Sequence, residues 1–190
     1  MSGGITRSNS KGSLKARVRL LSKFKHITTF VFDVDGVLTD GNLFLLAEGL
    51  MARRMNIRDG YALQLAVKKG YRVLVISGGD SVEVKDRLTR LGIKDIWMKV
   101  TDKKAILDNF IQENSLTKES VLYMGDDIPD SQVMRVVGLP CCPADAVQEI
   151  KELSVYTSHI KGGDGCARDV IEKVMKLRGD WNEDVTVRAK

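Results

Sequence analysis

The regular alternation of short apolar runs with longer amphipathic stretches is the feature that most limits the fold of this chain. Runs that are apolar throughout are typical of strands buried on both faces of a sheet, whereas apolar residues three and four positions apart predict helices. This order predicts a doubly wound α/β fold, in which helices cover both faces of a parallel sheet. The expected strands are residues 30–32, 71–77, 95–100, 121–124, 140–143 and 155–158. The expected helices are residues 14–24, 60–69, 81–91, 103–114, 130–137, 146–153 and 166–177.

Carboxylates gather where two of these strands end. Asp33 and Asp35 follow the first strand, and side chains at i and i+2 of a strand project from the same face. Asp126, Asp127 and Asp130 follow a later strand. Because neighbouring carboxylates repel one another, a hard divalent cation with a phosphate-bearing substrate is an economical explanation for both groups. The alternatives are a turn-forming Asp-Gly for the first pair and helix capping for one member of the second group.

Two further segments have the chemistry of an anion site. Ser77, Gly78 and Gly79 follow an apolar strand, and a hydroxyl with consecutive backbone N–H groups can hold phosphate oxygens. Lys103 begins a predicted helix, where an ammonium group and a helix N-terminus both favour an anion. Taken singly, the first segment is also interpreted as an ordinary turn and Lys103 as a solvated lysine. Because the carboxyl ends of parallel strands meet at one edge of a sheet, all these groups are expected at a common site.

Between the first strand and the next helix, the pattern predicts a β-hairpin flap at about residues 42–57. Apolar segments flank Ala47, Glu48 and Gly49, which have the composition of a tight turn. Asp59 is expected to cap the helix that follows. The segment is too short for a separate cap domain.

The order and spacing of these motifs resemble those of the haloacid dehalogenase (HAD) superfamily of phosphotransferases. The matching positions are Asp33-Val34-Asp35-Gly36, Ser77, Lys103, and Gly125-Asp126 with Asp127 and Asp130. Two more motifs, residues 56–61 and 162–168, resemble the small, nearly capless branch of phosphatases acting on 3-deoxy-D-manno-octulosonate (KDO) 8-phosphate and on nonulosonate 9-phosphates. The resemblance covers residues 14–179, which are therefore expected to form a single HAD-like phosphatase domain with a Rossmann-like sheet.

The resemblance implies a two-step hydrolysis. Asp33 would attack phosphorus to form an aspartyl-phosphate, and Asp35 would act as general acid and then as general base. Mg²⁺ would be held by the Asp33 carboxylate, the Asp35 backbone carbonyl and the Asp126 carboxylate. Ser77 and Lys103 would hold the transferring phosphoryl oxygens.

The resemblance also implies that Asp127 or Asp130 would orient Lys103 and metal-bound water, while Gly78 and Gly79 would contribute to substrate binding. Where several relatives carry a basic residue after the glycine of the second motif, this chain has Gly79. Recognition of the sugar acid is therefore expected to rest on other residues, with Arg58 and Arg168 as the candidates in matched motifs. Arg53, Arg54 and Lys161 are further candidates, although a solvated flap surface is the favoured interpretation for the two arginines.

The resemblance also implies a substrate and an assembly. The expected reaction is hydrolysis of KDO 8-phosphate in cell-surface lipopolysaccharide synthesis, and the alternative substrate is a nonulosonate 9-phosphate. A non-catalytic oligomerisation module is a rival from another class, and a phosphomutase is disfavoured because it usually brings a larger cap. With no cap domain, the branch covers its sites by forming a homotetramer with shared active sites.

Composition limits the other partners. Residues 1–32 carry seven bases and no acid, which leaves 23 of the 30 bases against 25 acids in the remainder. Residues 1–13 are expected to form a disordered basic leader, with a transit peptide as the alternative, and residues 180–190 a tail. This charge distribution is weak evidence for nucleic-acid binding. No apolar run approaches the roughly 20 residues that span a bilayer. Three cysteines without a metal spacing predict reduced thiols in a cytoplasmic protein.

Overall fold

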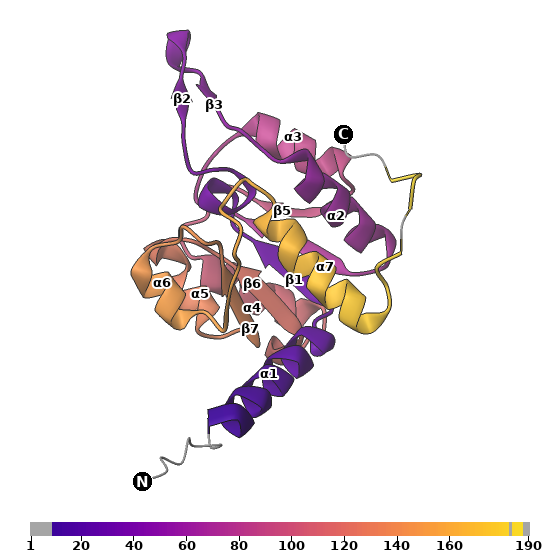
Figure 1. Cartoon of the computed structure of the whole chain (residues 1–190). Helices are drawn as coiled ribbons and strands as arrows, with labels where there is room; N and C mark the ends of the chain where they lie inside the picture. The colour runs from indigo at the N-terminus through magenta and orange to yellow at the C-terminus, as the bar shows by residue number, and fades with distance from the viewer. Residues whose placement is uncertain (1–8, 183, 188–190) are drawn as a thin grey trace.

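A six-stranded parallel sheet forms the centre of the computed structural model, which describes residues 9–182 and 184–187. The strand order is β5-β4-β1-β6-β7-β8, so β1, which precedes the first pair of carboxylates, lies inside the sheet between β4 and β6 (Figure 1). The predicted doubly wound α/β fold is thereby confirmed. The strands of this sheet are β1 (Thr29–Phe32), β4 (Arg72–Ile76), β5 (Asp95–Trp97), β6 (Val121–Met124), β7 (Leu139–Cys142) and β8 (Tyr156–Thr157).

Helices cover both faces of this sheet, and the side chains of β1 show why. Phe30 and Phe32 point into one buried cluster with residues of α1, α2, α3 and α7, whereas Val31 points into the other with residues of α4, α5 and α6. This alternation requires residues that can be buried on both faces of the strand: Phe30, Val31 and Phe32 are apolar, and the strand begins with the buried hydroxyl residue Thr29. The helices are α1 (Asn9–His26), α2 (Ile57–Lys68), α3 (Val82–Arg90), α4 (Lys103–Glu113), α5 (Ser131–Met134), α6 (Gln148–Leu153) and α7 (Cys166–Arg178).

Two predicted helix starts differ from the structure by three residues or more. Helix α1 begins at Asn9, so residues 9–13 are helical instead of disordered, while residues 1–8 of the expected leader lie outside the described part of the chain. Helix α2 begins at Ile57, and its N-cap is Asn56, whose side chain accepts a hydrogen bond from the Arg58 N–H. The prediction that Asp59 caps this helix was wrong. Asp59 lies in the first turn, where it is buried and accepts a 2.7 Å hydrogen bond from the backbone N–H of Arg168.

The predicted hairpin flap is present and projects from the body of the molecule (Figure 1). Strands β2 (Phe44–Leu45) and β3 (Met51–Ala52) pair antiparallel and are shorter than expected. Glu48 and Gly49 have φ values of 61° and 75°, which places two successive left-handed residues in the turn. The strand residues are exposed, with Leu45 at 79% of its full accessibility. The flap therefore carries apolar surface that the described remainder of the chain does not cover.

The described part of the C-terminal segment packs against α2. Trp181 makes an edge contact with Tyr61, and Lys68 forms a 2.6 Å ion pair with Asp184. Residue 183 and residues 188–190 of the expected tail lie outside the described chain. Among residues 9–182 and 184–187, no helix is both long and apolar enough to cross a membrane. The three cysteines are buried and unpaired, in line with the expected thiols.

Candidate active site

The carboxyl ends of β1, β4 and β6 and the start of α4 enclose a cavity of about 330 Å³. Each predicted phosphate-site and metal-site residue lines this cavity. They are Asp33, Asp35, Ser77, Gly78, Gly79, Lys103, Asp126, Asp127 and Asp130. A larger cavity of about 620 Å³ lies beside it, between the flap and the start of α3. The residues that the motifs predicted to act together are thus assembled by the order of the parallel strands.

A buried ion-pair network lies at the floor of the cavity. The Lys103 Nζ is 2.8 Å from the Asp33 Oδ2 and 2.7 Å from the Asp130 Oδ1, and all three residues are less than a tenth exposed. The Val34 N–H donates to the other Asp33 oxygen at 2.7 Å. Burial, followed by the charge of Asp130, raises the pKa of Asp33 to about 6, and Lys103 opposes that rise. Burial alone would lower the pKa of Lys103, but the two carboxylates raise it overall, so the lysine stays charged.

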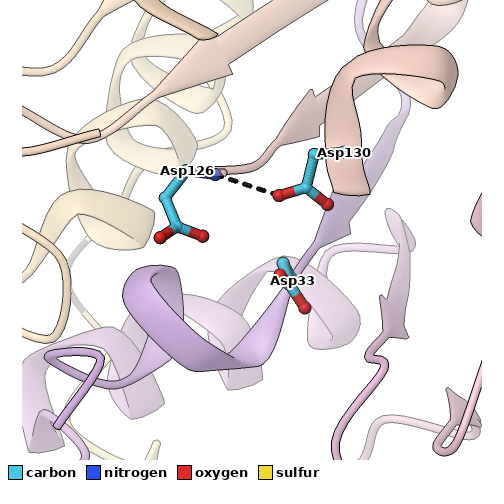
Figure 2. Close-up of side chains that lie close together, drawn as sticks. All are labelled: Asp33, Asp126 and Asp130. Atoms are coloured by element: carbon cyan, nitrogen blue, oxygen red, sulfur yellow. Dashed lines mark hydrogen bonds between the residues drawn. The ribbon is translucent and has the colours of Figure 1, made fainter. Parts of the chain in front are cut away.

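Three carboxylates from two parts of the chain surround a common space (Figure 2). Asp33, Asp126 and Asp130 can each place an oxygen within 4.8 Å of the others. Both oxygens of Asp130 are already engaged: one accepts from Lys103 and the Tyr123 hydroxyl, and the other from the Asp126 N–H. The Asp126 Oδ1, in contrast, is buried and has no hydrogen-bond partner among residues 9–182 and 184–187. An acceptor of this kind is costly unless a cation compensates it.

The Asp126 carboxylate is held close to the backbone of the first motif. A Cβ at Gly36 would lie 1.9 Å from the Asp126 Oδ2, and Gly36 has a φ of 83°, so both space and conformation require glycine there. Burial, followed by the charges of Asp130, Asp33 and Asp127, raises the pKa of Asp126 to about 8. Oxygen-only ligands of this charge suit a hard divalent cation held by Asp33 and Asp126, with Asp130 as the supporting acceptor.

Asp35 lines the same cavity but has a different partner. Its carboxylate is held by the Arg53 guanidinium, with the Arg53 Nε 2.7 Å from Oδ1 and Nη2 3.3 Å from Oδ2. The i, i+2 spacing predicted that Asp33 and Asp35 would project from the same face of one strand. Strand β1 instead ends at Phe32, so both acids lie beyond the strand and do not share a strand face. Asp35 lies in the turn after the strand, and its side chain is directed to the flap.

The Ser77 loop closes the other side of the cavity. The Ser77 Oγ accepts a 3.0 Å hydrogen bond from the Gly79 N–H, and Ser77 itself is 1% exposed. Backbone bonds from Ser77 to Trp97 and from Val100 to Ser77 tie the loop to β5 and to the segment before α4. The loop is thereby fixed next to Lys103, in a position to hold an anion.

Comparison with known proteins is decisive for the family. A 3-deoxy-D-manno-octulosonate 8-phosphate phosphatase KdsC from Salmonella typhi is 32% identical over 164 residues, which cover 86% of this chain and 87% of the relative. The protein of the same name from Escherichia coli K12 is 31% identical over 180 residues, which cover 95% of each chain. This chain belongs to the KdsC phosphatase family. No family model matches the sequence.

Solved structures agree with the KdsC assignment. The KDO 8-phosphate phosphatase from Moraxella catarrhalis, in complex with a magnesium ion, a phosphate ion and a KDO molecule, has a TM-score of 0.82 at 30% identity. The match covers 85% of this chain and 93% of that one. A HAD superfamily hydrolase of subfamily III A from Legionella pneumophila has a TM-score of 0.86 at 28% identity, with coverage of 90% and 93%. The resemblance to the HAD superfamily and its KdsC-like branch is therefore confirmed.

The two arginines predicted to bind the substrate lie away from the cavity of this KdsC-type chain. Arg58 and Arg168 line a separate cavity of about 490 Å³ at the start of α7. The Arg168 Nε pairs with Glu172 at 3.1 Å, and its guanidinium lies over the rings of Tyr61 and Trp181. Their role in substrate binding stays a prediction, and within one chain they do not reach the phosphate site.

Three residues of the site were missed from the sequence. Arg53 was interpreted as a solvated flap residue, although its side chain is 8% exposed and pairs with Asp35. Thr39 donates to the Asp35 Oδ1 at 3.4 Å, and the buried Tyr123 donates to Asp130. A phenol inside an otherwise apolar strand was the available signal for Tyr123, because a buried hydroxyl needs a partner. A signal for Arg53 was lacking, because flap charges are ordinarily solvated.

Proposed function

We propose that this chain is a Mg²⁺-dependent phosphatase that hydrolyses KDO 8-phosphate through an aspartyl-phosphate on Asp33. One observation carries the proposal. The buried Asp33–Lys103 pair lies next to the partnerless Asp126 oxygen, in a cavity that also holds the Ser77 loop. Membership of the KdsC family supports the choice of substrate, and the Moraxella complex supports Mg²⁺ as the cation.

The first displacement is performed by Asp33. Its carboxylate is held in place by Lys103 on one oxygen and the Val34 N–H on the other, so it meets the phosphoryl group in a fixed orientation. As the new bond to phosphorus forms, the bond to the sugar oxygen breaks, and Asp35 protonates the leaving oxygen. Lys103 and the Ser77 loop neutralise the phosphoryl oxygens.

The second displacement returns the enzyme to its starting state. Water attacks phosphorus and gives its proton to Asp35, while the bond to Asp33 breaks and releases phosphate. A Mg²⁺ ion held by Asp33, Asp126 and the Asp35 backbone oxygen would supply positive charge to the phosphoryl group. Asp130 keeps Lys103 in position, and Asp127 caps the short turn that carries Asp130.

The test is a comparison of kcat/KM on KDO 8-phosphate and on a nonulosonate 9-phosphate in the presence of Mg²⁺. We expect the octulosonate to be preferred by at least about tenfold, a difference of about 1.4 kcal/mol in transition-state binding. A preference for the nine-carbon substrate would make the nonulosonate 9-phosphate the proposed substrate instead. Lack of phosphatase activity on both would support a non-catalytic module instead.

We further propose a cytoplasmic homotetramer in which neighbouring chains complete each site. The exposed apolar residues of the flap and the position of Arg58 outside its own phosphate cavity support this arrangement. Asp33→Asn and Arg58→Ala chains should each be inactive alone and partly active when mixed and reassembled. Native mass spectrometry would verify the mixing. Verified hybrids no more active than their parents would assign Arg58 to its own chain.

A further inference from the structure

The flap is connected to the phosphate cavity by one buried cation. Strand β3 is exposed, yet the side chain of the next residue, Arg53, is only 8% exposed. Arg53 lines the 620 Å³ cavity under the flap, while its partner Asp35 lines the phosphate cavity. The Arg53–Asp35 pair therefore forms part of the wall between the two cavities.

The geometry of the pair fixes both oxygens of Asp35. The Arg53 Nε donates to Oδ1 at 2.7 Å and Nη2 to Oδ2 at 3.3 Å, which is the fork-to-carboxylate arrangement that only arginine can make. The Thr39 hydroxyl adds a longer bond to Oδ1. A carboxylate held at both oxygens cannot rotate freely about its side-chain torsions, although its side chain is 39% exposed to the cavity.

The Ser77 loop leaves room for this pair because it has no side chain at residue 79. A Cβ at Gly79 would lie 2.9 Å from the Asp35 Oδ2 and 3.5 Å from the Arg53 Nη2. Any larger residue there would push the Asp35 carboxylate out of its position unless the pair moved. The flap, the turn after β1 and the loop after β4 thus meet at a single point.

We propose that Arg53 is the positioning residue for Asp35. The catalytic carboxylate is therefore placed correctly only when the flap packs against the body of the molecule. The inference rests on the proposed phosphatase function. In the second displacement, water oxygen bonds to phosphorus, the bond to Asp33 breaks, and Asp35 accepts the proton of the water. The observed pair fixes the orientation of the Asp35 side chain for this step, with Oδ2 directed to the Ser77 loop.

The substrate p-nitrophenyl phosphate isolates that step. Its leaving group departs without protonation, so Asp35 is needed only for hydrolysis of the aspartyl-phosphate. For Arg53→Ala we expect kcat to fall by about 10- to 100-fold, part of the 10²–10⁴ typical of general acid–base catalysis, with KM falling in parallel so that kcat/KM changes by less than about threefold. Rapid mixing should show a burst of p-nitrophenolate approaching one per site, because phosphoenzyme accumulates.

Matched variants separate positioning from general effects. Arg54→Ala removes the same charge from the next residue of the flap, whose 56% exposed side chain pairs with Asp40 and Asp164, and should behave as wild type on p-nitrophenyl phosphate, which carries no sugar acid. Arg53→Lys keeps the charge but loses the forked pair of donors, and its kcat should lie between those of Arg54→Ala and Arg53→Ala. Adding Arg53→Ala to Asp35→Asn should cause no further loss of kcat. Circular dichroism checks folding, and Arg53→Lys replaces the alanine variant if that one unfolds.

Three results would overturn the inference. They are an Arg53→Ala variant with wild-type kcat and burst, a variant changed only in KM, and independent losses in the double variant. The second would make Arg53 a substrate-binding residue, and the third would give it a role separate from Asp35. If the wild-type chain hydrolyses no phosphate monoester, the proposed function fails. If the wild-type chain is active and the Arg53→Ala variant is equally active, only the role of Arg53 fails.

Discussion

Replacement of Asp126 by asparagine is expected to stabilise the metal-free protein above pH 7 and to abolish its response to Mg²⁺. Asp126 has a buried oxygen without a hydrogen-bond partner in the described part of the chain, and its neighbours add negative charge. Burial, followed by the charges of Asp130, Asp33 and Asp127, raises the pKa of Asp126 from 3.8 to about 8. The amide of asparagine has similar shape but cannot ionise, so the variant removes this unfavourable charge.

The sign and size of the effect follow from proton linkage. Because the folded chain keeps a proton on Asp126 that the unfolded chain releases, the free energy of unfolding decreases as pH rises from about 4 to about 8. The difference between 3.8 and about 8 corresponds to about 5 to 6 kcal/mol at about 1.4 kcal/mol per pKa unit. This value is an upper limit, because relaxation of the loop and water near the cavity reduce the cost of the charge. We therefore expect Asp126→Asn to raise the free energy of unfolding by about 2 to 3 kcal/mol at pH 8.

The assay is urea unfolding between pH 5 and 8, with a chelator or with excess Mg²⁺. Wild type should lose stability with rising pH under chelation and regain it with Mg²⁺, whereas Asp126→Asn should show a flatter profile and little response to the ion. Asp127→Asn removes a charge of the same sign from the adjacent, exposed residue and serves as the control. Parallel pH profiles for wild type and Asp126→Asn, or equal stabilisation of both by Mg²⁺, would refute the reasoning.

Three further outcomes are expected. Asp33→Asn should retain the fold and lose activity, because an amide cannot form the acyl phosphate; more than a few per cent of wild-type kcat would contradict this. Excess EDTA should abolish turnover, and Mg²⁺ should restore it better than Ca²⁺, whose looser coordination misplaces the nucleophile; full activity in EDTA would exclude a metal role. Lys103→Met should lower the free energy of unfolding by about 3 to 5 kcal/mol, since it leaves two buried carboxylates uncompensated; a urea-measured loss below about 1 kcal/mol would speak against that pair.

The parts of the fold that were predictable are those set by local pattern. Apolar runs between amphipathic segments require a sheet covered on both faces, and the parallel strand order brings Asp33, Ser77 and Asp126 to one edge. The start of α2 was not predictable in this way, because Asn56 and Asp59 are both good capping residues. Asp59 is engaged by the Arg168 N–H from α7, a contact between segments 109 residues apart.

The metal-site carboxylates illustrate the same division. Sequence spacing predicted that Asp126 and Asp130 belong to one site, because they follow the same strand. Their different environments depend on contacts from elsewhere in the chain. Lys103 and Tyr123 engage Asp130, whereas the Asp126 Oδ1 has no such donor.

Arg53 and Arg54 show most clearly where local information ends. The two arginines are adjacent and chemically identical, and their sequence surroundings suggest a solvated flap surface for both. In the folded chain, the Arg53 side chain is 8% exposed and holds Asp35, while that of Arg54 is 56% exposed and pairs at the base of the flap. Successive side chains of an extended segment point to opposite sides, so the way the flap sits on the body selects which guanidinium enters the cavity. Motif order was sufficient to predict which groups line the phosphate cavity, but the choice of partner for Asp35 required the three-dimensional position of the flap.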